Sequence, residues 1–80
     1  MISTQLEHRK EFILRFLGNV KEIWEESLHL EYWLEYGEED AYNNILMELQ
    51  NKHLIERGGE KVYIMLYYNG KRMNEKYINE

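Results

Sequence analysis

The pattern of apolar and polar residues is clearest between residues 39 and 64, where its period changes once. Tyr42, Ile45, Leu46 and Leu49 follow the i, i+3, i+4, i+7 spacing of one helix face. Further along, Val62, Ile64 and Leu66 alternate with Tyr63, Met65 and Tyr67, as side chains do in a β-strand. The pattern therefore predicts a helix over about residues 40–53, followed by a hairpin over about residues 54–67.

The N-terminal segment predicts another helix. Thr4 and Glu7 have the spacing of a capping box, so we expect this helix to begin near Gln5. Its apolar face is formed by Leu6, Phe12, Ile13, Phe16 and Leu17. Gly18-Asn19 is expected to end the helix, because both residues tolerate the left-handed backbone conformation of a C-cap.

Residues 20–36 allow two interpretations. Their apolar positions fit one long helix, or a short element followed by a helix near Leu30 to Tyr36. The absence of proline and the many glutamates favour helix somewhere in this stretch. Gly37 is expected to form the next turn, and Asp40 is expected to cap the helix that follows.

Glycine and asparagine mark the turns of the remaining chain. Leu54–Arg57 and Lys61–Tyr67 are predicted to pair as an antiparallel hairpin about Gly58-Gly59. Asn69-Gly70 is a second turn signal, and the segment 71–79 is expected to end the chain as a short helix. The predicted fold class is α+β and mainly helical, with three helices, a two-stranded hairpin and a short C-terminal helix.

Composition limits the organisation of the chain to one domain, residues 1–80. Eighty residues leave no room for a second core, while 44% hydrophobic residues suffice for one. The chain contains no cysteine, which fits a reducing compartment, and neither a signal peptide nor an apolar run of membrane-spanning length is evident. We therefore expect a cytoplasmic protein without membrane contact.

The net charge of −5 is unevenly distributed. Residues 22–40 contain no lysine or arginine and the following eight acids: Glu22, Glu25, Glu26, Glu31, Glu35, Glu38, Glu39 and Asp40. Residues 51–80 contain six basic residues against four acidic ones: Lys52, Arg57, Lys61, Lys71, Arg72 and Lys76 are the basic set. An acidic lobe is therefore expected beside a mildly basic one.

The C-terminal half of the chain resembles winged helix-turn-helix regulators of the MarR and PadR type and their small viral or archaeal relatives. In those families a pattern L-x-x-L-x-x-x-G-L-I-[ED]-R ends the recognition helix and is followed by a glycine-tipped wing. The matching residues here are Leu46, Leu49, Leu54, Ile55, Glu56 and Arg57, then Gly58-Gly59, Val62-Tyr63-Ile64 and Gly70-Lys71-Arg72. His53 replaces the glycine of the pattern, and histidine is among the residue types that tolerate positive φ.

This resemblance implies binding of double-stranded DNA by a homodimeric transcription regulator, located in the host cytoplasm if the protein is viral. The expected base-reading residues lie opposite the apolar stripe: Asn43, Asn44, Met47 and Asn51. Asparagine side chains can pair with adenine in the major groove. Lys52, Arg57 and Lys61 are the expected phosphate contacts, unless Arg57 and Lys61 instead pair with Glu56 and Glu60.

The alternative function is binding to a basic, nucleic-acid-binding protein through residues 22–40. Exposed carboxylates in this segment can imitate DNA phosphates, and Glu22, Glu25, Glu26, Glu31 and Glu35 form the expected partner surface. The same segment carries Trp24 and Trp33, which we expect in the core or at an interface, because they fall on apolar faces.

Enzymatic activity is not expected. His8, His29 and His53 lack metal-ligand spacing, and Ser3 and Ser27 lie in no nucleophile motif. No glycine-rich phosphate cradle is present, so we expect neither a catalytic residue nor a metal or cofactor.

Overall fold

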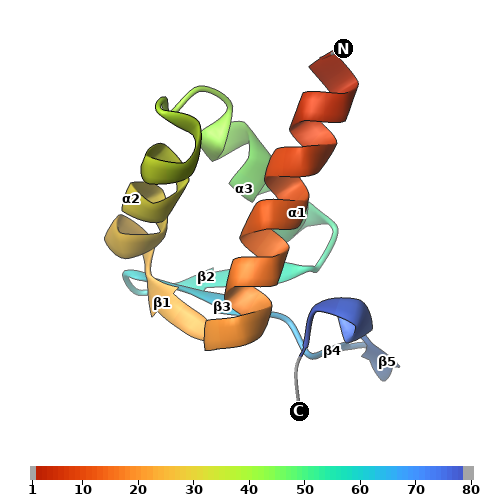
Figure 1. Cartoon of the computed structure of the whole chain (residues 1–80). Coiled ribbons are helices and arrows are strands. Elements are labelled where there is room, and N and C mark those ends of the chain that lie inside the picture. The colour runs from red at the N-terminus through yellow and green to blue at the C-terminus, as the bar shows by residue number, and fades with distance from the viewer. Residues whose placement is uncertain (1, 79–80) are drawn as a thin grey trace.

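The computed structural model describes residues 2–78, with side chains from residue 5 onward. Over this range the chain is an α+β structure of three helices and short antiparallel strands (Figure 1). The elements are α1 (Ile2–Val20), β1 (Glu22–Trp24), α2 (Glu25–Tyr36), α3 (Tyr42–Asn51), β2 (Ile55–Gly58), β3 (Lys61–Ile64), β4 (Tyr67–Tyr68), β5 (Lys71–Arg72) and the 3-10 helix η1 (Glu75–Tyr77). No helix within residues 2–78 has the length and apolar character that crossing a membrane requires.

β3 is the central strand of a three-stranded antiparallel sheet with the order β1-β3-β2. β2 and β3 form the predicted hairpin, but Gly58 lies opposite Lys61, so the turn consists of Gly59 and Glu60 and not of Gly58-Gly59. β1 pairs with the other edge of β3 and had not been predicted as a strand. Three residues are too few to establish an alternating pattern, so only its tertiary pairing defines this strand.

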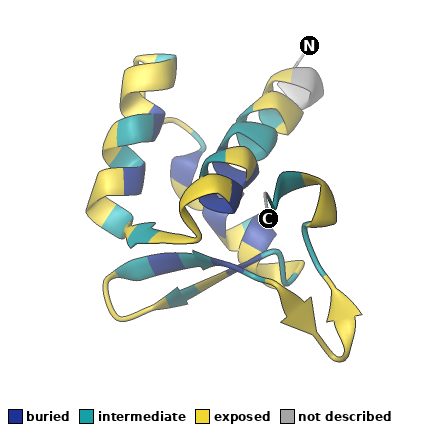
Figure 2. Cartoon of the chain, turned by 60° about the horizontal axis from the view of Figure 1, so that its bottom comes forward, coloured by how far each residue is buried: buried dark blue, intermediate teal, exposed yellow. Residues whose placement is uncertain are grey.

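The core lies between the helices and the sheet (Figure 2). Its buried side chains are Ile13, Leu14, Leu17, Leu28, Tyr32, Tyr42, Ile45, Leu46, Leu49, Ile55, Val62 and Ile64. The predicted apolar stripe of α3 is thus confirmed, since all four of its members are buried. Burial of each large side chain stabilises the fold by roughly 1.5–3 kcal/mol.

The start of α1 differs from the prediction. The helix begins at Ile2 rather than near Gln5, so Thr4 lies inside it and the predicted capping box is wrong. Ile13 and Leu17 are buried as expected, and Leu14 joins them because α1 packs against both the sheet and α3.

The end of α1 also differs from the prediction. Gly18-Asn19 does not end the helix; Lys21 takes the left-handed conformation instead, with φ 70°. Gly18 serves a different purpose, because a Cβ atom there would lie 1.9 Å from the carbonyl oxygen of Tyr77. This glycine therefore allows η1 to pack directly on α1, where a side chain would push it away.

Residues 20–36 form a strand followed by a helix, so the interpretation as one long helix is wrong. The helix begins at Glu25, five residues before the predicted position near Leu30. Its first residue is tied to the hairpin, because the amide of Glu25 donates to the carbonyl of Glu60 over 2.8 Å. That long-range bond is invisible in the sequence pattern.

The loop between α2 and α3 confirms one prediction and corrects another. Gly37 ends α2 in the left-handed conformation, with φ 70°, and donates its amide to Trp33 over 2.7 Å. Asp40 does not cap α3; Ala41 occupies that position, with φ 66°. The carbonyl of Asp40 instead accepts a hydrogen bond of 2.8 Å from the hydroxyl of Tyr32, which fixes the loop to the core.

His53 adopts the backbone conformation that the resemblance implies. Its φ is 61°, as required where the family pattern has glycine. The ring stacks on Tyr68, with centroids 3.7 Å apart and planes inclined by 8°. The stacking offsets part of the steric cost of a left-handed backbone at a residue with a Cβ atom.

The C-terminal segment is less helical than predicted. β3 ends at Ile64, so Leu66 is exposed instead of continuing the inner face of the strand to Tyr67. Asn69 and Gly70 form the predicted turn, at φ 52° and 79°, but it joins the small hairpin β4–β5. Only η1 within the segment 71–78 is helical, and Asn79 lies outside the described residues.

Candidate functional site

The cations of the β2–β3 hairpin are bound by carboxylates of the same chain. Arg57 donates from Nε and Nη2 to the two carboxylate oxygens of Glu25, over 3.0 and 2.7 Å. Lys61 lies 3.7 Å from Glu22 and 4.9 Å from the ring centre of Trp24. Arg57 and Lys61 therefore pair with carboxylates of their own chain, as the alternative to phosphate binding predicted. The partners named in that prediction, Glu56 and Glu60, were wrong.

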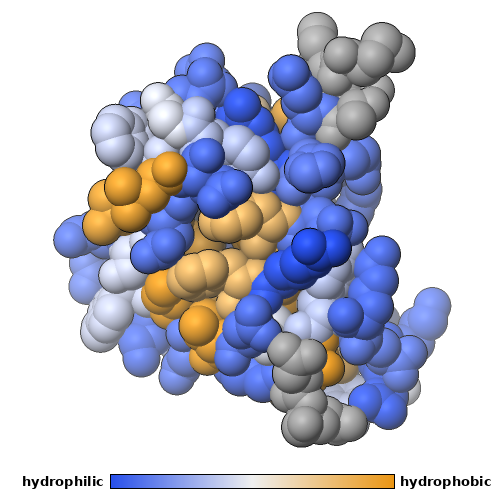
Figure 3. Space-filling view, viewed as in Figure 1, coloured by the Kyte–Doolittle hydropathy of each residue, from blue (hydrophilic) through white to orange (hydrophobic). Residues whose placement is uncertain are grey.

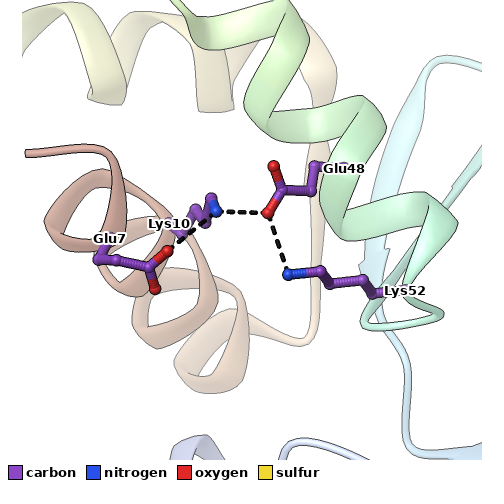
Figure 4. A network of polar contacts seen from close by, with 4 residues as sticks. All are labelled: Glu7, Lys10, Glu48 and Lys52. Atoms are coloured by element: carbon purple, nitrogen blue, oxygen red, sulfur yellow. Dashed lines mark hydrogen bonds and ion pairs between the residues drawn. The ribbon is translucent and has the colours of Figure 1, made fainter. Parts of the chain in front are cut away.

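Lys52 belongs to a network that links α1 to α3 (Figure 4). It donates to Glu48 over 3.0 Å, and Lys10 donates to the same carboxylate and to Glu7. The hydrogen bonds from Lys10 and Lys52 lower the pKa of Glu48, and the bond from Lys10 has the larger effect. All three predicted phosphate contacts therefore face a carboxylate of their own chain.

The predicted base-reading residues lie together on the outer face of α3. Asn43, Asn44, Met47 and Asn51 are all exposed. Carboxylates stand at the start of this helix, because Glu39 and Asp40 immediately precede it. Glu39 and Asp40 line one hollow together with Asn43 and Asn44, so a phosphate group at these amides would lie close to negative charge.

The predicted acidic surface divides into two sets. Glu22 and Glu25 are occupied by the hairpin cations. Within the described residues, the carboxylates of Glu26, Glu31 and Glu35 form no ion pair. These three carboxylates all belong to α2.

A shallow furrow surrounds His29, and sequence reasoning did not identify it. Three adjoining hollows share this histidine: one between α2 and the β2–β3 turn, one on α2 itself, and one at the start of α3. The lining acids are Glu25, Glu26, Glu39, Asp40 and Glu60. We call this region the His29 furrow; it joins segments distant in sequence, which explains why no local pattern marked it.

The position of His29 is fixed from two sides. Its Nε2 lies 2.9 Å from a carboxylate oxygen of Glu39. Its ring stacks on Tyr42, with centroids 4.5 Å apart and planes inclined by 14°. Burial raises the pKa of Tyr42, whose hydroxyl has no hydrogen-bond partner in the described part of the chain. The imidazole of His29 is therefore held in one orientation within a furrow lined by carboxylates.

Tryptophan side chains line this furrow instead of the core. Trp24 is 54% exposed and Trp33 is 50% exposed, so neither lies in the core, and their expected place at an interface stays a prediction. The inner positions of α2 are taken by Leu28 and Tyr32, which leaves its other apolar residues on the outside. Figure 3 shows an orange patch over α2, set among blue and pale side chains.

The described His, Asp and Glu side chains are possible metal ligands. Among residues 2–78, no three His, Asp or Glu side chains converge closely enough to hold a metal ion. The furrow presents carboxylates beside the aromatic rings of Trp24, Trp33 and His29.

Comparison of the chain with protein-family models, curated proteins and solved structures finds no significant match. The resemblance to winged-helix regulators therefore stays a prediction from the sequence. Functional inference rests on the geometry and charge of this chain alone.

Proposed function

We propose that the chain is a winged helix-turn-helix module that binds a lysine- and arginine-rich protein surface through the His29 furrow. The element order α1-β1-α2-α3-β2-β3 and the sheet order β1-β3-β2 support this architecture. In it, α2 and α3 are the helix-turn-helix pair and the β2–β3 hairpin is the wing.

One observation carries the choice of partner. The start of α2, the start of α3 and the wing turn together form the face that a winged helix presents to DNA, and here this face is lined by carboxylates. Phosphates are repelled there, whereas lysine and arginine are attracted. Arg57 and Lys61 of the hairpin do not make this face positive, because each forms an ion pair, with Glu25 and Glu22 respectively.

The sign of the furrow predicts a specific binding preference. Fluorescently labelled decalysine and a labelled random duplex are compared by anisotropy at low salt. We expect decalysine to bind with an affinity that falls as salt rises, and the duplex not to bind.

Charge reversal in the furrow tests whether that binding is local. Glu26→Lys and Glu60→Lys are expected to weaken decalysine binding about tenfold each, a loss of roughly 1.4 kcal/mol. Glu56→Lys is the matched control, because Glu56 is exposed on β2 and does not line the furrow. Equal effects of all three variants would reduce the binding to net charge and contradict the proposal.

A second candidate function is double-stranded DNA binding by a homodimer through α3. The exposed amide face of Asn43, Asn44 and Asn51 favours it, since a dimer would present two such faces to successive major grooves. Duplex binding at low salt that Asn44→Ala weakens and Glu26→Lys strengthens would support this function over the first.

A further inference from the structure

The outward face of α2 is apolar, which is unusual for a surface helix. Leu30, Trp33 and Leu34 follow the i, i+3, i+4 spacing and are 56%, 50% and 63% exposed. A surface helix normally directs its apolar stripe to the core and its polar side to water. α2 has a buried stripe of its own, Leu28 and Tyr32, so the outer stripe is a second one.

This outer stripe, Leu30, Trp33 and Leu34, is continuous with the His29 furrow. Leu30 and Trp33 line one of its hollows, together with Glu26, Ser27, His29 and Glu39. Contiguous exposed apolar surface with a polar rim is typical of protein interaction sites. Tryptophan is also the residue type most often found at the energetic centre of an interface.

Charge decides which occupant fits the outer stripe. Two copies packed face to face through the outer stripe would bring their acidic rims together, and these rims include Glu26, which has no ion pair within the described residues. An anionic membrane surface is repelled for the same reason. A cationic segment with an apolar stripe satisfies both the leucines and the carboxylates.

We infer that the outer stripe of α2 docks a basic amphipathic helix of the partner. The apolar side chains of that helix pack on Leu30, Trp33 and Leu34, and its lysines or arginines pair with Glu26 and the neighbouring carboxylates. This follows the helix-in-groove mode, in which anchors at helical spacing provide affinity. The inference rests on the proposed function and adds the partner's secondary structure and its apolar anchors.

Three labelled probes test this inference: a leucine–lysine peptide with helical amphipathic spacing, a peptide of the same composition in scrambled order, and decalysine. The two tryptophans of the chain both border the site, so binding is also read from their intrinsic fluorescence. We expect the amphipathic peptide to bind at least about tenfold more tightly than the scrambled one and to shift the emission to shorter wavelength.

Matched variants assign the binding to α2. Leu30→Ser and Leu34→Ser are each expected to weaken binding of the amphipathic peptide about tenfold. Leu34→Ser is also expected to leave decalysine binding unchanged, because Leu34 lines none of the three hollows of the furrow. Leu66→Ser is the control, because Leu66 is 45% exposed and lies outside the furrow. All three residues are exposed, so we expect each variant to fold, and circular dichroism is the check.

The outcomes separate the inference from the proposed function. If decalysine binds and depends on Glu26, while the scrambled and amphipathic peptides bind equally, the inference fails and the proposed function survives. If no cationic probe binds at low salt, both fail. If sedimentation shows a dimer that Leu30→Ser dissociates, the occupant is a second copy and the inference is overturned.

Discussion

Replacing Glu25 and Arg57 by alanine, singly and together, measures how firmly the wing cation is held. The pair makes two charge-assisted hydrogen bonds, of 3.0 and 2.7 Å, and its side chains are 35% and 29% exposed. Exposed ion pairs contribute about 0.2–1 kcal/mol, and hydrogen bonds to charged groups about 1.5–3 kcal/mol. For a bidentate, partly exposed pair we expect a coupling energy of about 1–1.5 kcal/mol, once solvent screening is included.

The assay is urea denaturation of the four proteins, followed by far-ultraviolet circular dichroism. Tryptophan fluorescence is unsuitable, because Trp24 lies against the neighbouring Lys61 and would respond to local changes. Glu25→Ala also removes a carboxylate from the first turn of α2, which costs about 0.3–1 kcal/mol through the helix dipole. The double-mutant cycle cancels that contribution and leaves the pair energy.

A coupling energy below about 0.3 kcal/mol, which is the usual error of additivity, would refute the reasoning. Arg57 would then be free to reach a phosphate, and the second candidate function would gain a contact. If the pair forms as described, 1 M salt is expected to reduce the coupling by about half, because the screening length falls to about 3 Å.

Further predictions concern stability. Tyr42→Phe is expected to stabilise the fold by about 1 kcal/mol in urea denaturation, because it removes a buried hydroxyl without a partner in the described chain; Tyr32→Phe, which loses two hydrogen bonds, should destabilise it by a similar amount. Gly18→Ala is expected to cost about 1–3 kcal/mol despite better helix propensity, because the new methyl group meets the carbonyl of η1; a gain in stability would contradict that packing. Hydrogen bonds from Lys10 and Lys52 lower the pKa of Glu48. They therefore stabilise the fold above pH 4.5, and this stabilisation is lost as the pH falls below that value. Melting temperatures between pH 7 and pH 3 should therefore fall less steeply for Glu48→Gln than for the original chain.

Features specified by several neighbouring residues could be predicted from the sequence. The four-residue stripe of α3 is buried, Gly37 ends α2, and Asn69-Gly70 forms a turn. His53 takes positive φ, at 61°, as its place in the motif implies. In each case the local chemistry and the final structure favour the same conformation.

Features that depend on partners distant in the chain could not be predicted. Arg57 and Glu25 are 32 residues apart, so the partners that sequence reasoning chose for Arg57, its neighbours in the hairpin, were wrong. β1 is defined only by its pairing with β3. Trp33 could not be assigned to the core or the surface, because α2 has two apolar stripes and the sequence does not reveal which of them faces the core.

The central claim is that the working surface is the acidic His29 furrow, which Asn43 and Asn44 also line, and not the rest of the outer face of α3, at Met47 and Asn51. The most direct measurement is a nuclear magnetic resonance titration of the nitrogen-15-labelled protein with the leucine–lysine peptide and, separately, with a random DNA duplex. The account predicts that the peptide shifts the backbone amides of residues 24–33, 39–44 and 59–60, and that the duplex shifts none. Shifts confined to residues 43–51 on addition of DNA, with no response to the peptide, would contradict it.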